Sequence, residues 1–83
     1  MMYKLARYDR DKKLELDSCI LGRRELLIKL DLILWYNSKL RAQVQKELKD
    51  LKCSEDAIWF GVKDSRLDVT YAFQYKITIY KEE

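Results

Sequence analysis

The sequence predicts an α+β domain in which one long helix packs across a four-stranded, largely antiparallel sheet, in the element order ββαββ. Residues 23–52 carry apolar side chains at spacings of three and four, which is the repeat of a helix with one buried face. The stretches before and after this segment alternate apolar and polar residues, which is the repeat of a strand. A chain of 83 residues is enough for one modest core, so we expect a single domain over residues 1–83.

Two short alternating stretches predict an N-terminal β-hairpin. They are residues 3–8 and 13–20, and the charged segment 9–12 between them has the length of a hairpin loop. The apolar residues of the second stretch share one face, which we expect to be the buried one: Leu14, Leu16 and Ile20.

The segment 23–52 predicts a single continuous helix. Its main apolar stripe consists of Leu26, Leu30, Ile33, Leu40, Val44, Leu48 and Leu51. The phase of this stripe does not slip, and a helix of that length is a rod of about 45 Å at about 1.5 Å per residue. Such a rod is longer than a domain of this size needs, which favours contact with a partner. In the alternative interpretation residues 29–34 form a strand and the helix starts only after Asn37 and Ser38.

The first half of this predicted helix carries a second apolar stripe, formed by Ile28, Leu32 and Trp35, roughly opposite the main one. A helix that is apolar on two sides needs cover on two sides. Asn37 would be the single polar residue in a heptad seam along the main stripe, a position that can fix register and oligomer state. Ile28, Leu32, Trp35 and Asn37 are therefore the candidate protein interface, and we expect a homodimer that uses the long helix.

The C-terminal part of the chain predicts two more strands. Residues 57–62 form the first, with Gly61 as a candidate bulge site, and residues 64–68 form a loop. Residues 69–80 form the second, because they alternate strictly and are rich in β-branched and aromatic residues. We expect the aromatic residues of both strands to be core rather than a platform for stacking bases: Trp59, Phe60, Tyr71, Phe73 and Tyr75.

The sequence offers little for catalysis. It has no His, so the commonest general base and metal ligand is missing, and its two glycines cannot build a phosphate-binding loop. Cys19 and Cys53, at opposite ends of the predicted rod, are expected to be unpaired, buried, small apolar residues. The neighbouring carboxylates are interpreted as solvated surface: Glu15 with Asp17, and Asp64 with Asp68. We expect no enzyme, no cofactor, no metal and no small-molecule substrate.

Positive charge is concentrated on the predicted helix. The chain carries a net charge of +3, and residues 23–52 hold eight positive and four negative side chains. A candidate nucleic-acid face lies opposite the main stripe and consists of Arg24, Lys39, Lys46 and Lys49. A nucleic-acid-binding dimer is therefore the alternative function.

The leading hypothesis is a small, non-enzymatic protein-interaction module, such as a regulator, an inhibitor or an accessory subunit. Its partner would be another protein or a second copy of the chain. A short chain without His, Pro or a recognisable motif is also typical of small viral or mobile-element proteins that bind host components. No apolar run approaches the ~20 residues needed to span a bilayer, and no signal-peptide pattern is present, so we expect a cytoplasmic protein without membrane contact.

Overall fold

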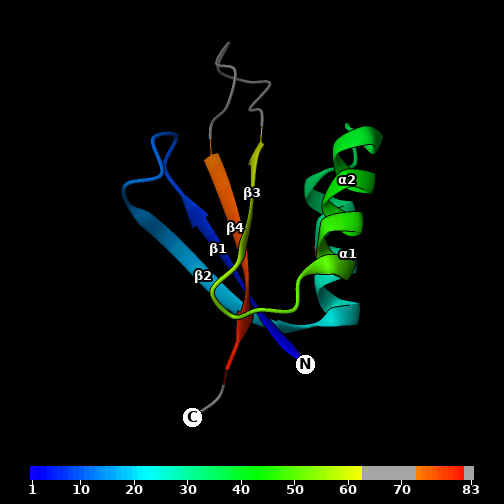
Figure 1. Cartoon of the computed structure of the whole chain (residues 1–83). Helices are drawn as coiled ribbons and strands as arrows, with labels where there is room; N and C mark the ends of the chain where they lie inside the picture. Colours follow the sequence, from blue (N-terminus) through cyan, green and yellow to red (C-terminus); the bar gives the residue numbers. More distant parts are fainter. Residues whose placement is uncertain (63–72, 82–83) are drawn as a thin grey trace.

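Four antiparallel strands form one layer of the fold, and two helices form the other. The computed structural model describes residues 1–62 and 73–81 (Figure 1). The elements are β1 (Met2–Tyr8), β2 (Glu15–Gly22), α1 (Arg23–Ile33), α2 (Ser38–Asp50), β3 (Ala57–Val62) and β4 (Phe73–Tyr80). The strands lie in the order β2-β1-β4-β3, and each neighbouring pair is antiparallel. The predicted α+β class and antiparallel sheet are thus confirmed, while the single long helix is wrong.

The predicted rod is two helices that run in opposite directions (Figure 1). At the end of α1 the backbone N–H of Leu34 still donates to the carbonyl of Leu30, at 2.8 Å. Asn37 then caps α2, because its side-chain oxygen accepts from the N–H of Leu40 at 3.1 Å. Asn37 is therefore not the polar residue of a heptad seam. The alternative of a strand at 29–34 is also wrong, although it placed the start of the second helix within one residue of Ser38.

The reversal between the helices determines the direction of the last two strands. With a single helix the chain would cross the domain once between β2 and β3, which would leave β1 and β4 parallel. The second helix adds one more crossing, so β4 enters the sheet antiparallel to β1. The register pairs Met2 with Tyr80 and Tyr8 with Gln74.

The core lies between the helices and one face of the sheet, as the main stripe predicts. Leu26 and Leu30 of α1 and Val44 and Leu48 of α2 are at most 1% exposed, and Ile33 and Leu40 pack partly buried against them. The sheet contributes Tyr3, Leu5, Ile58, Phe60 and Ile77. Leu34, outside the predicted stripe, is also fully buried, because the chain turns there.

The predicted hairpin is confirmed, but its apolar face is not buried. The side chains expected to be covered are exposed instead, by 62% for Leu14, 42% for Leu16 and 39% for Ile20. The register between β1 and β2 shifts between Arg7 and Tyr8, which leaves Leu16 as the extra residue of a bulge. In β2 it is Cys19 and Leu21 that pack against the core. This strand is at the edge of the sheet, where simple alternation does not decide which face is inside.

The third strand has the predicted bounds. Gly61 pairs with Gln74 without a change of register, so the bulge is not at this glycine. Strand β4 is confirmed over its described residues, with Ile77 fully buried on the face that the alternation indicates. The predicted loop at 64–68 and the first part of the predicted strand, residues 69–72, lie outside the described residues.

Candidate interaction surfaces

The three apolar residues of the second stripe lie on the outside of the helical layer. We call Ile28, Leu32 and Trp35 the outer apolar surface; they are 54%, 69% and 76% exposed. Ile28 and Leu32 lie one turn apart on α1, and Trp35 follows in the turn between the helices. The Trp35 ring meets the ring of Tyr36 edge to face, with centroids 6.2 Å apart. Asn37 does not belong to this surface, because its side chain caps α2.

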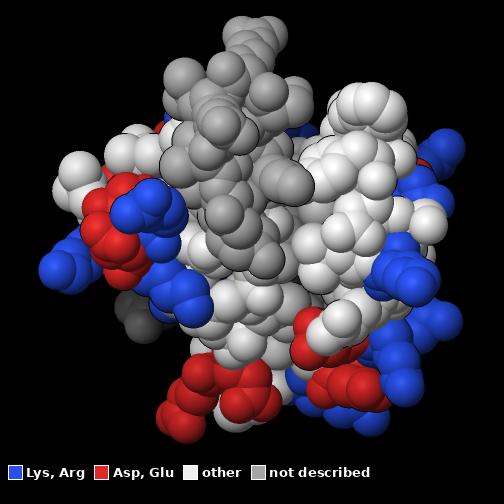
Figure 2. All heavy atoms as spheres, turned by 90° about the horizontal axis from the view of Figure 1, so that it is seen from above, with Lys and Arg blue, Asp and Glu red and all other residues white. Residues whose placement is uncertain are grey.

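The predicted basic residues are divided between the helices. Arg24 lies in the first turn of α1, whereas Lys39, Lys46 and Lys49 belong to α2, and all four are exposed. Because the helices are antiparallel, the start of α1 and the end of α2 lie at the same end of the layer (Figure 1). Figure 2 shows basic side chains gathered along the helical side of the molecule.

A single ion pair joins the two helices across this layer, among the described residues. The Arg41 guanidinium of α2 lies 3.7 Å from the Asp31 carboxylate of α1, and both side chains are partly exposed. The lysines of α2 have no ion pair with a described carboxylate.

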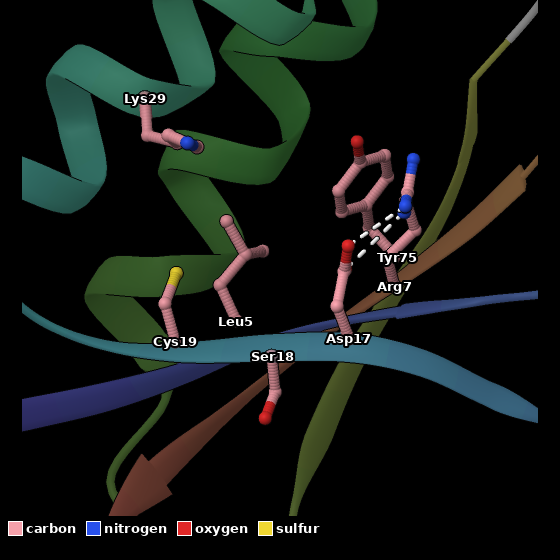
Figure 3. A pocket seen from close by; sticks show the side chains of 7 residues that line it. All are labelled: Leu5, Arg7, Asp17, Ser18, Cys19, Lys29 and Tyr75. Carbon is pink, nitrogen blue, oxygen red and sulfur yellow. Dashed lines mark hydrogen bonds and ion pairs between the residues drawn. The ribbon is translucent and has the colours of Figure 1, made fainter.

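A pocket of about 360 Å³ opens between α1 and the sheet (Figure 3). It is lined by Leu5, Arg7, Asp17, Ser18, Cys19, Lys29 and Tyr75. Arg7 donates to Asp17 through two nitrogens, Nε at 3.2 Å and Nη2 at 2.7 Å, so these two charges largely satisfy each other. Sequence reasoning did not find this pair, because the bulge in β2 decides which residue faces Arg7.

The phenol of Tyr75 borders the same pocket. Burial raises the pKa of Tyr75 above its ordinary value, while the nearby Arg7 guanidinium partly opposes the rise. The hydroxyl therefore stays protonated at neutral pH and can donate a hydrogen bond. Besides the Arg7–Asp17 ion pair and this phenol, the lining holds the Ser18 hydroxyl, the half-buried Cys19 thiol and the exposed Lys29.

The aromatic residues of the last two strands divide between the two faces of the sheet. Phe60 and Tyr75 stack at 5.3 Å on the helical side, where the sequence predicts core. Trp59 is on the other face, so the expectation that it joins the core is wrong. There its ring lies against Tyr8, with centroids 5.0 Å apart. Tyr71 lies outside the described residues.

The two cysteines are free thiols, Cys19 half-buried and Cys53 exposed. The prediction that both are buried is therefore wrong for Cys53. Within residues 1–62 and 73–81, no cluster of three or more His, Cys, Asp or Glu side chains could hold a metal ion. In the same part of the chain neither helix has the length and apolarity to cross a membrane.

The fold and its surfaces define a small two-layer α+β domain with two helices on one face of a sheet. No family model matches the chain, and neither a curated protein nor a solved structure matches it.

Proposed function

We propose that this protein is a small interaction module that acts by binding another protein molecule, in the first place a second copy of itself. The observation that carries the proposal is the outer apolar surface. Its three residues are large and apolar, follow one another along α1 and the turn, and are each more than half exposed. An uncovered group of large apolar side chains is typical of a protein–protein contact.

A second copy fits this surface because an apolar stripe on a helix is complementary to itself. In a two-fold dimer each residue is used twice, so the α1 helices of two chains would pack side by side, with Leu32 near the axis. The charged side chains of α2 would remain in solvent at the edge of the contact. As in the sequence-based prediction, the dimer would form by helix-to-helix contact between two chains, but the contact would use α1 alone.

The length of α1 limits the strength of this dimer. The helix has 11 residues, which corresponds to about 16 Å at about 1.5 Å per residue. A contact of that length buries less than the ~800 Å² per partner of a standard interface. We therefore expect a weak dimer that forms at micromolar chain concentrations. A dimer of this strength suits a regulator or accessory subunit that exchanges partners.

Sedimentation equilibrium over a range of micromolar concentrations tests the proposal. The chain offers a matched pair of exposed leucines, because Leu32 is 69% exposed on α1 and Leu14 is 62% exposed in the β1–β2 loop. Leu32→Ser should raise the dimer dissociation constant by about tenfold or more, since burying one leucine is worth about 1.5–3 kcal/mol. Leu14→Ser should leave it unchanged. A chain that stays monomeric at tens of micromolar, or equal effects of the two changes, would overturn the proposal.

The basic residues of α2 support a second candidate function, binding of nucleic acid along the helical layer. The supporting observation is that Lys39, Lys46 and Lys49 are exposed and have no ion pair with a described carboxylate. Replacing Lys46 and Lys49 by Glu should abolish binding to duplex DNA and leave the dimer intact. Binding that does not weaken as salt rises would exclude phosphate contacts as its basis.

A further inference from the structure

The face of the sheet that points away from the helices is covered by no described element (Figure 1). We call it the open face, and the strand registers identify its residues. Its centre is Tyr8 of β1 against Trp59 of β3, with ring centroids 5.0 Å apart and ring planes at 57°. Both rings are half-buried, so each lies against the sheet and still presents surface to solvent. The β4 strand lies between β1 and β3, so the rings meet over it.

Positive charge surrounds these two rings. The Lys12 and Lys76 ammonium groups lie 5.0 Å and 5.4 Å from the centre of the Trp59 ring. Lys4, on the same face of β1, pairs with Glu15 at 3.2 Å. The charged strand residues of this face are Lys4, Lys76 and Glu15, and the β1–β2 loop adds Lys12 beside the indole as well as Asp9 and Asp11. The indole is attractive to cations through its π-face, which holds the lysines beside the aromatic pair.

We propose that the open face binds single-stranded nucleic acid. Unpaired bases would stack on Trp59 and Tyr8, and Lys12 and Lys76 would contact the phosphates on either side. The argument is charge complementarity together with flat aromatic surface, which is the combination by which proteins hold single strands without reading their sequence. The bound base would displace Lys12 or Lys76 from the ring, and the released ammonium would reach a phosphate. This site is distinct from the basic residues of α2, and it does not depend on the dimer.

The two tryptophans allow a direct test, because the chain has only two and each marks a different surface. In Trp35→Phe the only indole is Trp59, on the open face. Titration with a thymidine oligonucleotide of about 12 nucleotides should quench its fluorescence. In the matched variant Trp59→Phe the only indole is Trp35. It should not respond, although fluorescence anisotropy of a labelled oligonucleotide should still report binding, since phenylalanine also stacks on bases.

Affinity measurements then separate stacking from charge. Trp59→Ala should weaken binding by about tenfold, in the range found when a stacking aromatic is removed. Each of Lys12→Gln and Lys76→Gln should weaken binding and lower the slope of log affinity against log salt by about 0.7. The control Lys29→Gln, an exposed lysine of α1 on the helical side of the sheet, should change neither quantity. Circular dichroism checks that each variant is folded. If Trp59→Ala does not fold, the fluorescence comparison of Trp35→Phe with Trp59→Phe still tests the proposal.

Several outcomes would overturn the proposal. The absence of binding at about 50 mM salt would do so. Quenching of Trp35 instead of Trp59 would do so as well, and so would loss of binding when only the α2 lysines are replaced. Equal affinity for a duplex of the same sequence would also overturn it, because paired bases cannot stack on the rings. Binding to anionic vesicles without binding to the oligonucleotide would assign the open face to a membrane surface instead.

Discussion

The two helices lie over the same sheet and bury similar inner faces, but their outer faces differ. In α1 the inner residue Leu30 is fully buried, while the outer residues Ile28 and Leu32 are apolar and exposed. In α2 the inner residues are equally buried, while the outer face is polar and basic. Burial of the inner faces stabilises the fold, and the polar outer face of α2 can remain in solvent without further cover. The outer face of α1 is left exposed, which is why we propose a partner for it.

The helices also differ in how they begin. Asn37 caps α2 with its side-chain oxygen, whereas the residue at the cap position of α1 is Gly22, which has no side chain to accept a bond. Glu25 in the first turn of α1 offers only a favourable charge near the helix dipole. The start of α2 is therefore specified by its own sequence, while the start of α1 depends more on packing against the sheet.

The largest expected effect is the difference in stability loss between substitutions on the inner and the outer face of α1. Leu30→Ala should lower the free energy of unfolding by about 2–5 kcal/mol, since it leaves a cavity in the core. Leu32→Ala should change it by less than about 0.5 kcal/mol when measured on the dilute monomer. Urea denaturation followed by circular dichroism measures both. Similar losses for the two variants would mean that the outer leucine is covered within the chain, and the contrast between the helices would fail.

The next effect concerns the reversal between the helices. Asn37→Ala should lower the free energy of unfolding by about 1 kcal/mol, since the N–H of Leu40 loses its acceptor. Asn37→Asp keeps a side-chain acceptor and serves as the control. If Asn37→Ala instead gained helical signal and stability, the Asn37 side chain would not be what stabilises the start of α2.

A smaller effect, a gain in the free energy of unfolding, is expected when α1 is given the capping side chain that it lacks. Gly22 has an extended backbone, and an added Cβ would meet no atom within 4 Å. Gly22→Asp should therefore raise the free energy of unfolding by about 0.3 kcal/mol, as expected when a good capping residue replaces glycine. Gly22→Ala, which adds the Cβ without the acceptor, should give no gain. A gain with alanine as well would point to an unfolded-state effect.

The smallest effect is expected at the ion pair between the helices. Asp31→Asn removes the partner of Arg41, but the pair is 3.7 Å long and both side chains are partly exposed. Its loss should change the free energy of unfolding by less than about 0.5 kcal/mol, and added salt should reduce even that difference. A loss of more than about 1 kcal/mol would mean that charge, and not the apolar inner faces, holds α1 and α2 together.

Much of the fold follows from periodicity alone. The spacing of the main stripe identified the residues that pack on the sheet, and the alternation at 57–62 gave β3 its bounds. The reversal at 34–37 was missed because the apolar phase continues through it without Gly or Pro. The signal was present in Asn37-Ser38, since Asn is among the preferred helix caps. A capping residue inside an apolar repeat favours the start of a new helix over one continuous rod.

The surfaces were harder to predict than the core. Alternation placed Leu16 and Ile20 on a buried face, but a bulge and an edge position expose them, and neither feature has a marker in a single sequence. Strand aromatics are usually core, which predicts Trp59 there, and only the strand register places it beside Tyr8 on the other face. The outer apolar surface, by contrast, was recognised from helical spacing, and its role as an interface stays a prediction.

The pairing of Met2 with Tyr80 has a practical consequence. The start of β1 and the end of β4 are neighbours in the sheet, so a short glycine-rich loop can join them as a hairpin. Cutting the chain at 35–36 would then give a circular permutant that begins with α2 and ends with α1. Both helices would be free of their covalent link, and the permutant would reveal whether the sheet alone is enough to align them.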